Sequence, residues 1–184
     1  KVILSCITLD LFAVLFGGAV ALLPVYANDI LNVGPKGLGI LRASPAAGAL
    51  LMGLFIARNP VRKNAGKILL ATVSGFGICI LVFAVSKVFL LSIAALALSG
   101  MFDNVSVIIR QTIIQLRTPD NMKGRVSAVN SIFIGSSNEI GSFESGTAAK
   151  IMGTVPSVLF GGIMTLLVVF TLGILSKKLK EFHL

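Results

Sequence analysis

The residues of this sequence that could carry chemistry are ionisable side chains placed within long apolar stretches. Six such groups interrupt stretches that are otherwise almost free of charge: Asp10, Arg42, Asp103, Arg110, Glu139 and Glu144. A charge is costly in an apolar environment, so these groups normally face the interior of a helix bundle or a water-filled cavity. A carboxylate held there can exchange a proton near neutral pH. The pattern therefore indicates ligand binding or proton transfer inside an apolar protein.

Asp10 is the carboxylate whose position is least consistent with simple exposure to water. It lies about two turns inside the first apolar stretch, residues 3–27, which contains no other charge. Asp10 is therefore the first candidate for a proton-coupling residue, followed by Glu144 and Glu139. Two alternatives stay open. Asp10 could only form a hydrogen bond to a neighbouring helix or pair with a residue of a missing half of the protein, and Glu144, near the end of its stretch, could simply be hydrated. Glu139 and Glu144 lie some 140° apart around a helix, so they should not share a pocket.

Polar residues also recur at intervals of seven, which places them on one helix face about 10.5 Å apart along the axis. Asp103 and Arg110 have this spacing, and Asn104 and Gln111 repeat it beside them. The stripe could line a solute cavity, or Arg110 could lie in the headgroup layer and extend its side chain to water.

The same interval relates Asn130, Ser137 and Glu144 in a later stretch that is rich in Ser, Gly and Asn. We take Asn130 and Ser137, the four residues described above and one arginine as candidates for lining a substrate cavity. They are Asp103, Asn104, Arg110, Gln111, Asn130, Ser137 and Arg42.

The sequence contains no catalytic or cofactor-binding constellation. Its one histidine, His183, is one residue from the end, and Cys6 and Cys79 lie in apolar runs without metal-ligand spacing. We find no Ser/His/Asp set, no Cys/His cluster and no glycine-rich phosphate loop. We therefore expect neither an enzyme nor a protein that binds a metal or cofactor.

The elements that position these residues are predicted to be membrane helices. Of the 184 residues, 55% are hydrophobic and only 12% are charged, and the mean hydropathy is +0.97. Soluble domains carry about 25% charged residues, and a soluble fold of this length cannot hide so much apolar surface. The net charge of +9 does not indicate nucleic acid, because the basic residues form short clusters between apolar runs instead of one patch.

Six stretches are long enough to cross the hydrocarbon core of a bilayer, which takes roughly 20 apolar residues. None shows the apolar/polar alternation of barrel strands, so we predict an all-α integral membrane protein. The third helix of each successive triplet carries no charge, as two repeats of three helices would produce. The predicted spans are residues 3–27, 37–57, 68–86, 88–116, 126–149 and 154–175.

Basic residues in the short loops predict the orientation, because cytoplasmic loops are enriched in Lys and Arg. Eleven lie on one side: Lys1, Arg58, Arg62, Lys63, Lys67, Arg117, Lys123, Arg125, Lys177, Lys178 and Lys180. Only Lys36, Lys87 and Lys150 lie on the other. We therefore predict that both ends of the chain are cytoplasmic. Since the sequence does not begin with Met, we also expect it to start within a longer protein.

Small residues four apart in the second stretch, such as Ser44 and Gly48, would let another helix approach closely. They could serve packing within this bundle or contact with a second half of the protein.

Several segments resemble helices 7, 8, 10 and 11 of one branch of the major facilitator superfamily. That branch contains the bacterial enterobactin exporter and related drug-efflux proteins. The matching segments are residues 9–27 (helix 7), 37–51 (helix 8), 110–115, 118–120, 122 and 124–126 (helix 10 into helix 11) and 136–146 (helix 11). The resemblance implies the C-terminal half, helices 7 to 12, of a twelve-helix transporter of the bacterial inner membrane. It also implies that the first helix of each triplet lines the central cavity and that the second faces the missing N-terminal half.

The chain departs from the superfamily at the cytoplasmic gating motif, where Gly is followed four residues later by Asp and then by a basic residue. Here Gly53 is followed by Ala57 and Arg58, so the acidic member is absent. A gate on this side would have to use its basic and loop residues differently. These candidates are Arg58, Arg62, Lys63, Pro119, Gly124 and Arg125.

The functional hypothesis is a secondary transporter that moves an amphipathic small molecule, such as a siderophore or drug, out of the cytoplasm against entering protons. Alternating access would arise from rocking of the two halves around a site at the bilayer midplane. The expected partners are the lipid bilayer, the missing N-terminal half and the small molecule, and not nucleic acid. Two alternatives stay open: a lysophospholipid flippase of the same superfamily, and a half-size membrane scaffold that does not transport.

Overall fold

The computed structural model describes residues 18–59 and 64–175, which form helices joined by short turns and no strand. Asp10, Arg62 and Lys63 lie outside the described residues. The first described segment is helical throughout and consists of η1 (Gly18–Leu22), α2 (Leu23–Val25) and η2 (Tyr26–Ile30). The later elements are α3 (Gly34–Arg58), α4 (Ala65–Val85), α5 (Phe89–Arg117), η3 (Asp120–Met122), α6 (Lys123–Met152) and α7 (Thr154–Leu175).

The five long helices occupy the last five of the six predicted spans. Each helix end lies within three residues of the corresponding predicted end. Local chemistry explains two of these ends. Thr118 is extended because the proline that follows it disfavours the helical conformation, so α5 stops at Arg117. Gly153 has a φ of 95°, which only glycine adopts readily, and it separates α6 from α7.

Four of the described helices are long and apolar enough to cross a membrane by length and composition: α3, α4, α5 and residues Thr154–Thr171 of α7. The helix α6 has 30 residues, but its many Ser, Asn and Glu side chains lower its hydropathy. The described part of the first helix, Ala19–Ile30, is apolar but shorter. The protein is therefore an all-helical membrane protein in which α6 differs from the other long helices by its polarity.

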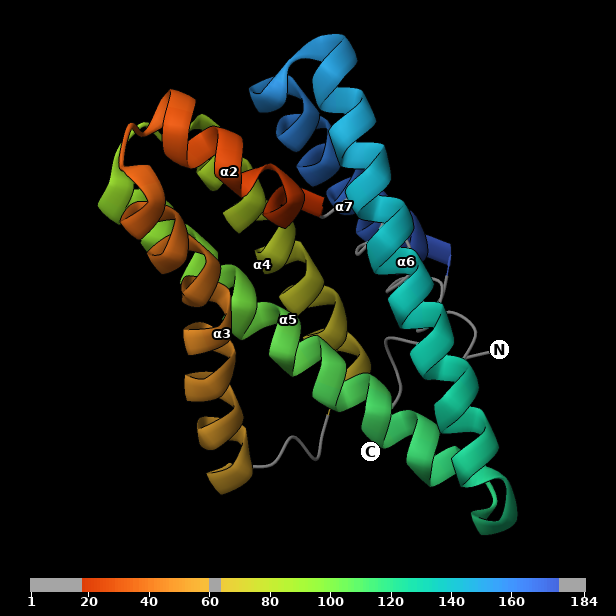
Figure 1. The fold of residues 1–184 in the computed structure, drawn as a ribbon. Coiled ribbons are helices and arrows are strands. Elements are labelled where there is room, and N and C mark those ends of the chain that lie inside the picture. Colours follow the sequence, from red (N-terminus) through yellow and green to blue (C-terminus); the bar gives the residue numbers. More distant parts are fainter. Residues whose placement is uncertain (1–17, 60–63, 176–184) are drawn as a thin grey trace.

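The helices pack in a continuous series, which Figure 1 shows as a ribbon. The helix α3 packs against α5, α5 against α4, α4 against α7, and α7 against α6. The first segment adds a further connection, because η1 contacts both α6 and α7. In Figure 1, α3 and α6 lie on opposite sides of the view and α5 runs diagonally between them.

Glycines let α3 and α5 approach to backbone contact. A Cβ atom on Gly48 would overlap the carbonyl group of Ala97, and one on Gly100 would overlap that of Pro45. The Asn104 side-chain amide, one turn further along α5, donates a hydrogen bond to the Ala49 carbonyl. Of the two roles predicted for the small residues of α3, the structure therefore shows packing within this bundle.

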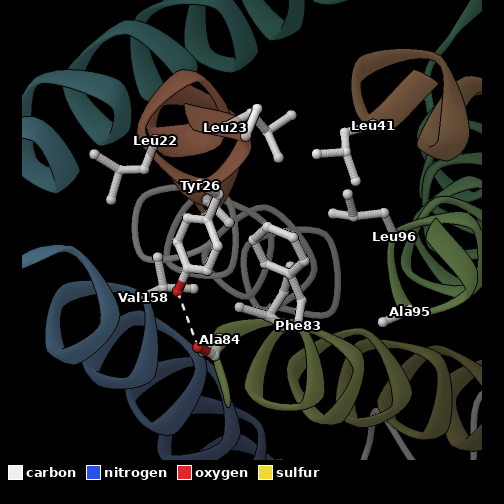
Figure 2. Close-up of a cluster of buried hydrophobic side chains, with 12 residues drawn as sticks. Leu22, Leu23, Tyr26, Leu41, Phe83, Ala84, Ala95, Leu96 and Val158 are labelled. Carbon is white, nitrogen blue, oxygen red and sulfur yellow. Dashed lines mark hydrogen bonds between the residues drawn. The ribbon is translucent and has the colours of Figure 1, made fainter. Parts of the chain in front are cut away.

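Two apolar cores lie toward opposite ends of α4 and α5. The first surrounds Tyr26 and Phe83, which are fully buried and whose ring centroids are 4.5 Å apart (Figure 2). The second joins Leu69 and Val73 of α4 to Ile109 and Ile113 of α5. The middle of the helices lies between these cores.

Candidate functional site

A cavity of about 200 Å³ lies between the two cores and is bounded by η1, α3, α4, α5 and α6. Its apolar lining includes Val20, Phe76 and Ile80, together with Pro45. Its polar lining comes from α5 and α6 and consists of Ser99, Asp103, Asn138 and Ser142.

The cavity lies near the midpoint of the helices that form it. Asp103 is the central residue of α5, which spans Phe89–Arg117. Asn138 lies within one residue of the centre of α6, and Pro45 lies within one residue of the centre of α3. The helices α3 and α5 are long and apolar enough to cross a membrane, and a group at the midpoint of such a span would lie near the bilayer midplane.

Asp103 continues a stripe of α5 whose neighbouring members are buried. Ser99, four residues before it, and Arg110, seven residues after it, are 3% and 7% exposed, whereas Asp103 is exposed. Both Ser99 and Asp103 line the cavity. Among the described residues, none forms a hydrogen bond or an ion pair with its carboxylate.

Arg110, predicted to share a cavity face with Asp103, is instead packed into the bundle. Its Nε donates a hydrogen bond of 3.3 Å to the Ser106 carbonyl oxygen of the preceding turn. Arg110 does not line the cavity and forms no ion pair with Asp103, which lies two turns away.

Asn138 and Ser142 bring α6 into the site, although neither was among the residues expected from the sequence. They are one turn apart, and neither side chain forms a hydrogen bond within the described residues. Their orientation follows from the packing of α6, whose buried residues are Ser137, Gly141 and Ser145, also one turn apart. Each cavity residue directly follows a buried one, so packing of the small residues turns Asn138 and Ser142 toward the cavity. The signal in the sequence was their spacing of four.

The polar residues of α6 selected by the interval of seven lie elsewhere. Ser137 is buried, and its Oγ donates a hydrogen bond of 2.8 Å to the Phe133 carbonyl oxygen of its own helix. Asn130 and Glu144 are half-buried, and the Ser145 hydroxyl lies 3.5 Å from Glu144 Oε2. Glu139 is exposed and does not line the cavity.

The remaining cavity candidates also lie outside this cavity. Asn104 faces α3, where it binds the Ala49 carbonyl. Gln111 and Arg42 are exposed on α5 and α3. The structure therefore brings only Asp103 of the seven candidates into this cavity.

The candidate loop residues that the structure describes are exposed: Arg58 at the end of α3, and Pro119, Gly124 and Arg125 around the start of α6. Beside them Lys123 Nζ lies 2.6 Å from Asp120 Oδ1. The hydrogen bond from Lys123 and its positive charge lower the pKa of the Asp120 carboxyl below its ordinary value of 3.8. Within the described ranges, no group of three or more His, Cys, Asp and Glu side chains could hold a metal ion.

Comparison with known proteins identifies relatives with a membrane function. A protein-family model described as transmembrane secretion effector matches residues 2–183. The enterobactin exporters EntS of Citrobacter koseri and Salmonella typhimurium are each 27% identical to the chain over 146 residues. EntS of Escherichia coli O1:K1 is 25% identical over the same length. Each match covers 79% of this chain and 35% of the relative, so the chain spans about a third of the length of these curated relatives.

The family match covers nearly the whole chain, and its description agrees with the all-helical, apolar structure. The relatives are named as enterobactin exporters. The chain therefore belongs to the transmembrane secretion effector family of the major facilitator superfamily of membrane transporters.

Proposed function

We propose that the chain is the C-terminal half of a secondary transporter that exports an amphipathic small molecule of the siderophore or drug class. The family match and the names of the EntS relatives support export, and a match to 35% of the relatives supports a partner half elsewhere in the full-length protein. In this proposal the chain forms one wall of the substrate cavity, and rocking against the N-terminal half gives alternating access.

The cavity at the middle of the helices is the observation that carries the proposal. A transported solute must be bound where both sides of the membrane can reach it in turn, which is the midplane. The cavity at that depth combines an apolar wall with an amide, a hydroxyl and a carboxylate that has no partner among the described residues. Apolar pockets with a few polar groups are typical of small-molecule sites.

The proposal includes six spans arranged as two repeats of three. The polarity of α6 is compatible with a span, because polar residues are tolerated where a helix faces a watery cavity or the bundle interior. The proposal also includes a cytoplasmic location for both ends of the chain, which the asymmetry of basic residues supports.

The full-length protein, purified and reconstituted into proteoliposomes, tests this function. With a proton gradient imposed, we expect uphill transport of the siderophore enterobactin or of a lipophilic drug such as ethidium, and none in protein-free vesicles. Transport of a fluorescent lysophospholipid alone would favour the flippase instead. Absence of transport for all three would contradict the proposed function.

Proton coupling is a separate part of the proposal, with Asp10 as first candidate and Glu144 and Glu139 as the others. Asp10 lies about two turns inside an otherwise uncharged stretch, whereas Glu144 is half-buried and Glu139 is exposed. The variant Asp10→Asn should lose uphill transport in the reconstituted protein and keep downhill exchange. Uphill transport at the wild-type rate would exclude Asp10 as the coupling residue.

A further inference from the structure

The cavity contains one formal charge within the described part of the chain, the carboxylate of Asp103. The nearest basic residue on its helix, Arg110, lies two turns away, is 7% exposed and does not line the cavity. A carboxylate at the depth of the bilayer midplane is costly without a compensating charge or hydrogen-bond donor. The cavity is therefore complementary to a ligand group that carries a positive charge and hydrogen-bond donors.

The neighbouring polar groups extend this complementarity. Asn138 and Ser142 face the same cavity, and their side chains, like that of Asp103, have no hydrogen-bond partner among the described residues. Together the three side chains offer several acceptor oxygens to a ligand with more than one N–H or O–H donor. Phe76 also lines the cavity, and aromatic rings attract cations.

The volume limits what can occupy the site. At about 200 Å³ the cavity is smaller than the pockets of roughly 300 to 1,000 Å³ that enclose whole drug-sized ligands. It fits a polar head group with the first part of an apolar body, and the rest of an amphipathic molecule would extend beyond it.

We propose that this cavity is the subsite for a protonated amine of the exported molecule, with Asp103 as its counter-ion and Asn138 and Ser142 as hydrogen-bond partners. The inference rests on the proposed export function and narrows its substrate class to cationic amphiphiles. An anionic head group, such as an ionised catecholate or carboxylate, is disfavoured, because it would lie against the Asp103 carboxylate and no described cation lines the cavity.

Equilibrium binding to the purified full-length protein tests the proposal independently of transport. The probes share one carbon skeleton and differ in head-group charge: 4-phenylbutylammonium, 4-phenylbutanol and 4-phenylbutyrate. We expect the wild type to bind the ammonium most tightly and the carboxylate least. Hydrogen bonds to charged groups predict that Asp103→Asn weakens ammonium binding roughly ten- to a hundred-fold. Binding of the alcohol should weaken by a smaller factor, because its hydroxyl carries no charge and can donate a hydrogen bond to the asparagine amide oxygen as well as to the carboxylate.

A matched control is Asp29→Asn, the same chemical change at an exposed residue of η2, and it should leave all three affinities unchanged. If Asp103→Asn cannot be purified, Asn138→Lys should have the same selective effect, because it places a cation beside the carboxylate. Equal loss for ammonium and alcohol, no loss in either variant, or no ammonium preference in the wild type would each overturn the proposal. Loss of transport for every substrate with the ammonium preference intact would instead contradict the export function alone.

Discussion

The hydroxyl of Tyr26 is a single donor that joins two distant parts of the chain. It donates a hydrogen bond of 3.1 Å to the Ala84 carbonyl oxygen, 58 residues away (Figure 2). Ala84 lies in the last turn of α4, where carbonyl groups have no partner within the helix. Both residues are buried, so water is not available to replace the bond. At this scale the fold depends on pairing the few polar atoms that an apolar core contains.

The variant Tyr26→Phe keeps the ring contact with Phe83 and removes only this donor. Because the Ala84 carbonyl would stay buried without its partner, we expect a loss of about 1–3 kcal/mol in the free energy of unfolding. Denaturant unfolding of the purified full-length protein would measure it. Thr147→Val is the control, since it removes an exposed hydroxyl that bonds only to its own helix, and it should change stability little. Equal stability of the two variants would contradict this role of Tyr26.

The ion pair of Asp120 and Lys123 predicts a dependence on pH. Because folding lowers the pKa of Asp120, the pair stabilises the fold fully above the ordinary pKa of 3.8, and the contribution is lost as pH falls through the lowered value. NMR titration of the Asp120 carboxyl should show a midpoint below 3.8 in the wild type and in Lys123→Arg. In Lys123→Gln the midpoint should return toward the ordinary value. The same midpoint in all three proteins would show that Lys123 is not the cause.

Helix packing in this protein depends on small residues at contact points. Gly48 and Gly100 bring the backbones of α3 and α5 together, and Ser137, Gly141 and Ser145 form the buried face of α6. The Ser157 hydroxyl of α7 donates a 3.1 Å hydrogen bond to the Ser145 carbonyl, which further secures this face. Small residues of this kind are the usual means of close helix packing in membranes, where lipid is as apolar as a leucine side chain.

A pair of glycine substitutions separates packing from helix propensity. In Gly100→Ala the new methyl group would meet the Pro45 carbonyl, so α3 and α5 must move apart, and we expect a loss of about 1–3 kcal/mol. In Gly39→Ala the new methyl group meets no atom within 4 Å, so stability should be unchanged or should rise by up to about 1 kcal/mol. Thermal unfolding in detergent would compare them. A greater loss at Gly39 than at Gly100 would refute the contact.

The described part of the molecule combines many exposed apolar side chains with a polar cavity near the middle of its helices. Exposed apolar side chains such as Leu54, Phe55 and Phe170 would be unfavourable in water and are expected where a surface meets lipid or another helix bundle. The charged loop residues lie at the helix ends, and the Asp103 cavity lies between them.

The orientation of the molecule can be tested by labelling in intact cells. The basic residues predict that Lys123 is cytoplasmic and Lys36 external. In full-length protein whose native cysteines are replaced, Lys36→Cys should react with a membrane-impermeant thiol reagent, and Lys123→Cys should react only after the cells are opened. The reverse pattern would place both ends of this chain outside the cytoplasm.

The sequence by itself determined where the helices lie, because each is specified by residues close to one another. A stretch of apolar residues makes a span, and Thr118 before Pro119 or a glycine such as Gly153 ends a helix within one or two positions. The predicted ends of the long helices therefore differ from the observed ones by at most three residues. Within the described ranges, composition identifies α6 as a span least clearly, because this helix is less apolar than the other long helices.

Only the tertiary structure decided which polar residues meet. The interval of seven identifies residues on one face of a helix, but it does not indicate which face turns inward. In α6 it selected Ser137, which is buried, whereas the next residue, Asn138, lines the cavity. In α5 it joined Asp103 to Arg110, yet packing buries the arginine and leaves the carboxylate beside the cavity. The rotation of each helix about its axis is set by contacts with helices far away in the sequence, and these contacts are not encoded in the spacing within one helix.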